Sequence, residues 1–324
     1  FPYTTLFRSS VQLRSQQVNI ALPDLFPESS IALDTLNAQA RWKISEGQFD
    51  VELARAEFAG PDAAGMAQGS YHHHGEGPGS IDLTATLSRA DARAVWRYLP
   101  AAINVDARHW LRDALKAGAA SEAKLILKGD LAKFPFLDRK QGQFLVTVKA
   151  QGVTLDYGTG WPSISGIDAD LRFAGTGMVV MARRGTILGA RLTETLAEIP
   201  DFDAPVSTLK VKGRADGETS EFLKFIKLSP VAGQIDHFTD QMSASGKGHL
   251  EIALEIPLAE ARLGESRIAG TYTLLANEVN VDPALPPLRQ VKGSLQFSET
   301  SLRVPEINAQ LFGGQVRISG GSQD

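Results

Sequence analysis

Three consecutive histidines are the residues whose chemistry stands out first. His72, His73 and His74 lie between Tyr71 and the glycine-rich stretch 75–79. Consecutive side chains of an extended chain point to opposite sides, so at most two of these imidazoles could share one metal ion, and no further ligand pattern surrounds them. We therefore predict a solvated turn and no metal site.

The remaining histidines and the acidic pairs do not form a catalytic pattern. No serine or carboxylate spacing beside His109, His237 or His249 resembles a catalytic triad. Asp168 and Asp170 could suggest the two carboxylates of a glycosidase, but residues two apart on a strand share one face, here the polar one. We predict a solvated surface at this pair, no cofactor, and a protein that is not an enzyme.

Composition argues against several other classes of function. The 324 residues carry a formal net charge of −4, with 33 basic and 37 acidic residues, and the two signs are mixed along the chain. No basic surface of the kind that binds nucleic acid is expected. The chain has no cysteine, which excludes disulfides and thiolate metal sites. It shows no apolar run of about 20 residues and no export signal.

Most of the chain alternates between apolar and polar residues with a period of two. This period places successive side chains on opposite faces of a β-strand. Glycine-containing turns separate the runs at short intervals, as in an antiparallel sheet with one wet face. The apolar members of the clearest runs are Phe144, Val146 and Val148; Ile167, Leu171 and Phe173; Leu209 and Val211; Leu250, Ile252 and Leu254; and Val291, Leu295 and Phe297.

A few short helices are expected between the strands. Ser88 is expected to cap a helix that ends at Pro100, and Asp106 a second helix that ends before Gly118. A third is predicted over about 220–227. The predicted organisation is a β-segment over 10–87, a helical insertion over 88–122, and a second β-segment over 123–324.

Part of the chain resembles another part without any gap. Residues 161–192 can be set over 285–316, and six pairs are then identical, among them Pro162 with Pro286 and Phe173 with Phe297. The strand alternation coincides as well, which predicts an internal repeat of 124 residues. A looser third copy is expected over 36–58. Two unrelated β-meanders slid to their best offset would also show some likeness, so this alternative stays open.

A sheet with one apolar face must cover that face or bind an apolar ligand. The predicted helices cover only a small part of it. Many strands side by side twist and curl, which would make the apolar face the concave lining of a trough suited to acyl chains. The same alternation also describes a β-sandwich or β-helix with a dry core, and the pattern alone does not separate these alternatives.

The first nine residues differ from the rest of the chain. The run FPYTTLFRS, residues 1–9, matches the translation of a widely used sequencing-adapter oligonucleotide. We expect this run to be an artefact, and the sequence to be an internal fragment of a longer protein.

Several short motifs together resemble the YhdP family of large AsmA-like envelope proteins. Each motif is unspecific alone, but their order and spacing over about residues 20–320 are specific. The motifs are IDLTATLSRAD at 81–91 with RYLP at 97–100, Trp110-Leu111 with Gly118, LKGDL at 127–131 with Phe134-Pro135-Phe136, Gly160-Trp161-Pro162, and Leu311-Phe312-Gly313-Gly314.

The resemblance implies a strongly curved, U-shaped β-groove that carries phospholipid between the inner and outer membranes of a Gram-negative envelope. The implied partners are phospholipid or another acyl lipid, a membrane reached through an amino-terminal anchor outside this sequence, and envelope proteins; the implied location is the periplasm. The alternating apolar residues given above are the expected groove lining. Two rival hypotheses are an envelope scaffold that binds protein strands at its sheet edge and a carbohydrate-active enzyme.

Overall fold

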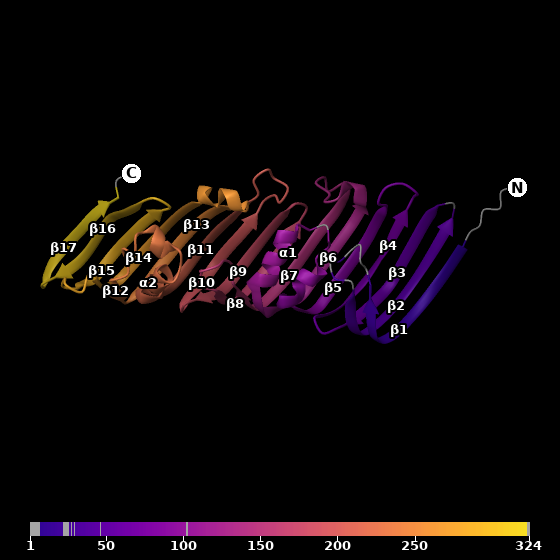
Figure 1. Ribbon diagram of the computed structural model, residues 1–324, viewed down its shortest axis with the longest axis horizontal. Coiled ribbons are helices and arrows are strands. Elements are labelled where there is room, and N and C mark those ends of the chain that lie inside the picture. Colours follow the sequence, from indigo (N-terminus) through magenta and orange to yellow (C-terminus); the bar gives the residue numbers. More distant parts are fainter. Residues whose placement is uncertain are drawn as a thin grey trace. The chain divides into compact units, whose positions relative to one another are not determined.

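The computed structural model describes residues 7–21, 26, 28, 30–45, 47–101 and 103–322. These residues form 17 β-strands of one antiparallel sheet that is not closed, together with a few short helices (Figure 1). The prediction of a mainly-β, antiparallel fold is confirmed. The chain divides into two compact units, residues 1–153 with 170–178 and residues 154–169 with 179–324.

The N-terminal unit is a β-meander in which each strand pairs with the next along the chain. Trp42 of β2 pairs with Val51 of β3, and Leu83 of β5 pairs with Leu127 of β6, so apolar residues face apolar residues across the ladder. Its strands are β1 (Phe7–Ile20), β2 (Ile31–Ser45), β3 (Gln48–Ala59), β4 (Ala63–His73), β5 (Ser80–Asp91), β6 (Leu115–Asp130) and, for the most part, β7 (Gly142–Leu155).

The helical part of this unit lies between β5 and β6. It consists of a 3-10 helix, η1 (Ala92–Tyr98), and α1 (Val105–Ala114). The expected caps are wrong. Asp91 caps η1 and Asn104 caps α1, because their side-chain oxygens accept hydrogen bonds from backbone N–H groups two residues further on, whereas Ser88 is still within β5. A one-turn 3-10 helix, η2 (Leu131–Lys133), follows β6.

The C-terminal unit continues the meander with one larger interruption. Strands β8 (Ile164–Ala174) and β9 (Gly177–Ile187) contribute to both units, and α2 (Thr219–Lys227) and α3 (Val231–Gln234) interrupt the meander after β11. A 3-10 helix, η3 (Glu260–Glu265), follows β13. The other strands are β10 (Ala190–Ile199), β11 (Thr208–Glu218), β12 (Ser243–Ser245), β13 (Lys247–Pro257), β14 (Arg267–Asn280), β15 (Leu288–Ser298), β16 (Leu302–Leu311) and β17 (Gly314–Gly321).

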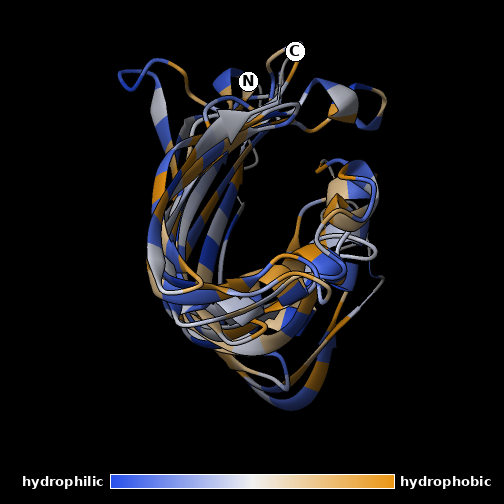
Figure 2. Cartoon of the chain, turned by 90° about the vertical axis from the view of Figure 1, so that its left-hand side faces the viewer, coloured by the Kyte–Doolittle hydropathy of each residue, from blue (hydrophilic) through white to orange (hydrophobic). Residues whose placement is uncertain are grey.

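Because neighbouring strands of the C-terminal unit are antiparallel, its connections alternate between two edges. The α2–α3 segment, the loop 281–287 and the turn 312–313 lie at one edge, which we call the helix edge. The loops 200–207, 258–266 and 299–301 lie at the opposite edge. In Figure 2, where this unit is nearest the viewer, the strands bend strongly between the two edges.

Several backbone features recur 124 residues apart. Strands β8 and β15 have the same length, and their first residues differ by that number (288 minus 164). Leu188 and Phe312 both have a φ of 50° and each precedes a glycine of positive φ. Gly152 and Ala276 share a φ of 61°. Left-handed backbone is uncommon outside glycine, so these coincidences support the proposed repeat beyond the sequence identities.

Candidate functional site

Eight of the predicted lining residues lie on one face of three strands in the C-terminal unit. The strand register shows that Val211 of β11 pairs with Leu254 of β13, and that Leu250 of β13 pairs with Tyr272 of β14, which in turn pairs with Leu295 of β15. The eight residues are Leu209, Val211, Leu250, Ile252, Leu254, Val291, Leu295 and Phe297.

The other six predicted lining residues lie on β7 and β8. Each is partly buried and alternates with neighbours of the opposite face. The ring of Phe144 packs edge-to-face against Phe134, with the centroids 5.3 Å apart. These six residues are Phe144, Val146 and Val148 on β7, and Ile167, Leu171 and Phe173 on β8.

The apolar face of the C-terminal unit is the inside of the strand bend. Helix α2 packs on this face, because Phe222 of α2 contacts Tyr272 of β14 with ring centroids 4.9 Å apart. In Figure 1, α2 lies in front of the strands, and Figure 2 shows that the strands bend toward that same side. Curvature therefore brings the apolar side chains of neighbouring strands together on a concave surface.

Most of the predicted lining is not sealed in a dry core. Of the fourteen residues, only Val291 is buried, at 2% exposure; the other thirteen are partly exposed. The chain exposes 19975 Å², whereas two separate compact globules, each of half its mass, would together expose roughly 16,000 Å². This much exposed surface argues against the β-sandwich alternative, in which a second layer would bury the apolar face.

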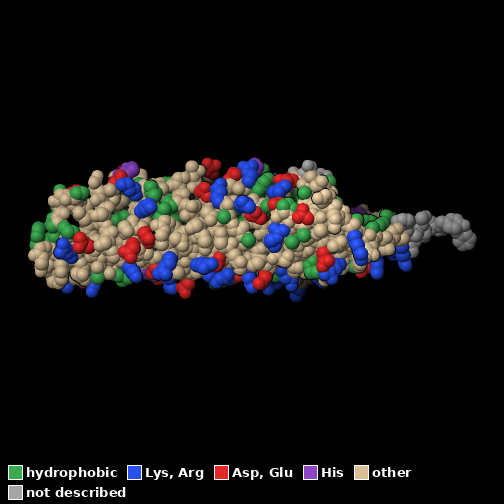
Figure 3. All heavy atoms as spheres, turned by 90° about the horizontal axis from the view of Figure 1, so that it is seen from below, with side chains coloured by type: hydrophobic (Ala, Val, Ile, Leu, Met, Phe, Trp, Pro, Cys, Tyr) green, Lys and Arg blue, Asp and Glu red, His purple; other side chains and the backbone are tan. Residues whose placement is uncertain are grey.

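The opposite face carries charged side chains in ion-paired rows. Arg214 of β11 donates to Glu194 of β10 at 2.7 Å and to Glu251 of β13 at 3.1 Å. His249 lies 2.8 Å from Asp216. Figure 3 views the outside of the bend and shows basic and acidic side chains spread along it. A hollow of about 610 Å³ is lined by several of these charged groups together with Ile252 and Phe297 of the apolar face.

The residues considered for metal binding and catalysis also pair with polar or charged neighbours. His72 Nδ1 lies 2.9 Å from Asp50 Oδ1, and the rings of His72 and His74 stack at 6.4 Å. Within the described residues, no group of three or more histidine or acidic side chains is placed to hold a metal ion. Asp168 forms a 2.6 Å ion pair with Arg184. The Asp168 side chain is 18% exposed and that of Arg184 is 72% exposed, so a cationic partner already occupies this carboxylate.

Helix α2 is fixed to the sheet by a buried polar cluster that the sequence patterns did not reveal. We call Thr219, Tyr272 and Asn277 the Thr219 cluster. The Tyr272 hydroxyl and the Asn277 amide both donate to Thr219 Oγ1, at 2.8 and 2.7 Å. Burial raises the pKa of Tyr272 to about 12, because the phenolate would lose its hydration. The alternation of β14 marks Tyr272 as apolar-face, but no sequence signal pairs Asn277 with Thr219.

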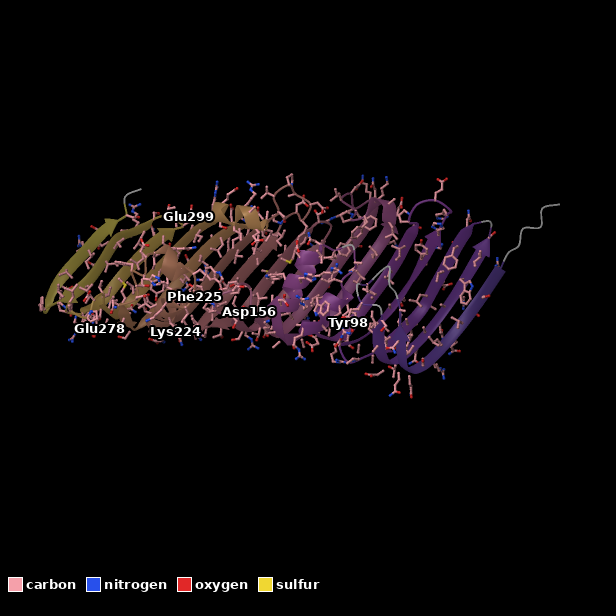
Figure 4. All side chains as sticks on the ribbon, viewed as in Figure 1. Tyr98, Asp156, Lys224, Phe225, Glu278 and Glu299 are labelled. Carbon is pink, nitrogen blue, oxygen red and sulfur yellow. The ribbon has the colours of Figure 1, made fainter. Side chains whose placement is uncertain are left out.

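An aromatic contact holds the other end of α2. The ring of Phe225, labelled in Figure 4 beside Lys224, lies 6.0 Å from that of Trp161, which lies 6.0 Å from Tyr157. Burial, followed by the charge of Asp156, raises the pKa of Tyr157 to about 12. Trp161 thus packs against α2, whereas Trp110 on α1 is 48% exposed.

Comparison with known proteins gives two matches. The family model described as YhdP protein matches residues 4–324. The "Intermembrane phospholipid transporter YhdP" of Escherichia coli (strain K12) is 23% identical over 323 residues, which is 98% of this chain and 23% of that protein. The chain thus spans about a quarter of the length of this relative. No solved structure matches the chain. None of the helices among the described residues is long and apolar enough to cross a membrane.

Proposed function

Because the chain belongs to the YhdP family, we propose that it is a segment of an intermembrane phospholipid transporter and that its concave apolar face holds acyl chains. The E. coli relative is a phospholipid transporter by name. The proposed location of the segment is the periplasm, between the two membranes.

One observation carries this proposal: an apolar face that is concave and only partly buried. In the C-terminal unit, Val211, Ile252 and Leu254 are each incompletely buried although they lie side by side in the ladder. Full burial of an exposed aliphatic side chain contributes about 1.5–3 kcal/mol, and each of these partly exposed side chains would gain the fraction that corresponds to its remaining exposed area. Lipid chains supply this burial without directional contacts, so a lipid can slide along the face while it remains bound.

The proposed mechanism uses no reaction. Acyl chains lie against the inside of the bend, and the polar head groups remain in water on its open side. No bond is made or broken, so the chain acts as a non-enzymatic path for lipid. The candidate lining residues of β7, β8, β11, β13 and β15 are part of this proposal.

The 124-residue repeat is proposed as the structural unit of the path. Strand β9 ends at Ile187 and β16 at Leu311, which are again 124 residues apart (311 minus 187). A repeated unit lengthens an apolar face without a new fold at each step. This property suits a protein that must span a long distance.

Native mass spectrometry of the whole chain purified from a bacterial periplasm tests the proposal, with extraction and identification of any bound lipid. We expect several phospholipid molecules per chain. Ile252→Asp places a charge on the apolar face and should remove most of this lipid. The matched control is Ala253→Asp, which adds the same charge one residue away on the opposite face, beside its ladder partner Lys212, and should keep the lipid.

A folded chain that emerges without lipid would contradict the proposal. Equal lipid loss in both variants would also count against it, since the face would then not matter.

A further inference from the structure

The apolar face of the C-terminal unit has two parts that differ in burial. Near the helix edge, a contiguous cluster is almost fully buried: Tyr272, Leu274, Val291, Ile307 and Ala309 are 1–8% exposed. We call this cluster the covered half. Toward the opposite edge, strands β11, β13 and β14 carry apolar residues that remain partly exposed, and we call these the open half. The open half consists of Leu209, Val211, Ile252, Leu254, Ile256 and Ile268.

Helix α2 covers part of this cluster. Its side chain Phe222 packs against the covered half, and the helix contacts β11, β12 and α3. The apolar residues Phe222, Phe225 and Ile226 alternate at helical spacing with the exposed Lys224 and Lys227. The apolar side of α2 thus fills the space over the strands that an acyl chain would otherwise occupy.

The Thr219 cluster fixes the first turn of α2 to the sheet. Asn277 is fully buried; besides its bond to Thr219, it donates to the Ser245 carbonyl at 3.1 Å and accepts from the Leu275 N–H at 2.6 Å. Thr219 is 5% exposed and accepts from two side chains. A buried polar group without a partner is costly, so release of α2 would require the two hydrogen bonds to Thr219 to break and would leave buried polar atoms of Tyr272 and Asn277 unpaired.

Further contacts stabilise the two ends of α2. The capping box formed by Glu218 and Glu221 closes its N-terminus, and Phe225 packs on Trp161. The capping box stabilises the helix itself, and the Phe225–Trp161 contact holds it in place. Helix α2 is therefore a fixed part of the folded unit.

We infer that α2 closes the covered half to lipid and confines acyl chains to the open half, so that Thr219, Phe222 and Asn277 position the lipid path without touching lipid. This inference rests on the proposed function and refines it. It moves Val291, a predicted lining residue, to the protein-packed side, and it assigns Ile256 and Ile268 to the path.

Single cysteines test the inference, since the chain has none of its own. We would make Leu254→Cys in the open half and Ile307→Cys in the covered half. Each full-length variant is incubated with phosphatidylethanolamine and phosphatidylglycerol vesicles doped with a phospholipid that carries a maleimide at the end of one acyl chain. Mass spectrometry measures the labelled fraction, and labelling by a small soluble maleimide in urea shows that each thiol is reactive.

We expect Leu254→Cys to be labelled at least ten times faster than Ile307→Cys. Thr219→Val keeps the shape of the side chain but removes the shared hydroxyl acceptor, and Phe222→Ala removes the packing contact. In either background, labelling of Ile307→Cys should rise at least fivefold while that of Leu254→Cys stays within twofold. Two backgrounds are used so that a folding failure of one leaves the other.

The outcomes distinguish a failure of the proposed role of α2 from a failure of the proposed lipid function. Equal labelling of both cysteines in the otherwise unchanged chain would overturn the inference while leaving the lipid site intact. Labelling of Ile307→Cys that stays low in both backgrounds would overturn the role of α2. If neither Leu254→Cys nor a further variant, Val211→Cys, is labelled, the proposed lipid function itself fails.

Discussion

Asn277→Ala is expected to be among the most damaging single substitutions in the C-terminal unit. Asn277 is fully buried in β14, and its side chain makes three hydrogen bonds that connect the strand to Thr219, Ser245 and its own backbone at Leu275. Alanine fits the strand backbone but cannot replace any of these bonds. The substitution therefore removes all three hydrogen bonds and also leaves a small cavity.

The expected magnitude follows from the groups that lose their partners. The Leu275 N–H and the Ser245 carbonyl lose hydrogen bonds, whereas the Thr219 hydroxyl still accepts from Tyr272. A fully buried group left unpaired costs about 1–3 kcal/mol, and these two groups are partly buried, so we expect the free energy of unfolding of this unit to fall by about 1–3 kcal/mol in total. Thr219→Val should not add fully to this loss, because both changes break the same bond.

Urea unfolding combined with hydrogen exchange of peptides from α2 and β14 measures the effect. Asn308→Ala is the control, since Asn308 is exposed on β16 and its side-chain amide donates to the exposed Glu306; its expected change is within about 0.5 kcal/mol. A loss below about 1 kcal/mol for Asn277→Ala, with unchanged exchange in α2, would refute the reasoning that buried hydrogen bonds hold the helix.

Two further substitutions and one titration follow from the structure. Gly270→Ala would place a Cβ 2.1 Å from Phe297 Cζ, so it should lower stability by about 1–3 kcal/mol in urea, whereas Gly264→Ala, which meets nothing within 4 Å, should not. Burial is the main cause that raises the pKa values of Tyr98, Tyr157 and Tyr272 to about 12. The contribution of these tyrosines to stability is therefore complete below pH 10 and is lost as the pH rises from 10 to 12. Absorbance at high pH should show their phenolates forming together with unfolding. Ionisation of more than two of the chain's five tyrosines well before unfolding would contradict this. Arg97→Met breaks the ion pairs with Glu28 and Asp62 and should lower the free energy of unfolding by about 1–2 kcal/mol, measured by thermal or urea unfolding. The control is Arg112→Met, which loses an exposed pair with Asp113. Equal effects of the two substitutions would show that the burial of Asp62 is unimportant.

The sequence by itself determined the two faces of the sheet. A period of two is a local property, so Leu250, Ile252 and Leu254 had to share one face whatever their neighbours were. The helix at 219–227 was likewise readable from Phe222, Phe225 and Ile226, because their spacing matches a helical turn. The caps were less readable, since Ser88 and Asp91 are both good capping residues and only the extent of β5 selects Asp91.

Tertiary structure alone decided which part of the apolar face is covered. The covering helix follows β11, but it packs on Tyr272, and Asn277 lies 58 residues from the Thr219 hydroxyl that it binds. Such contacts depend on the register of the intervening strands. The alternation determines which face of its strand a residue occupies, but not which residues of other elements lie beside it. The difference between Ile252, partly exposed, and Val291, buried, is therefore invisible in a pattern that treats both as apolar members of a strand.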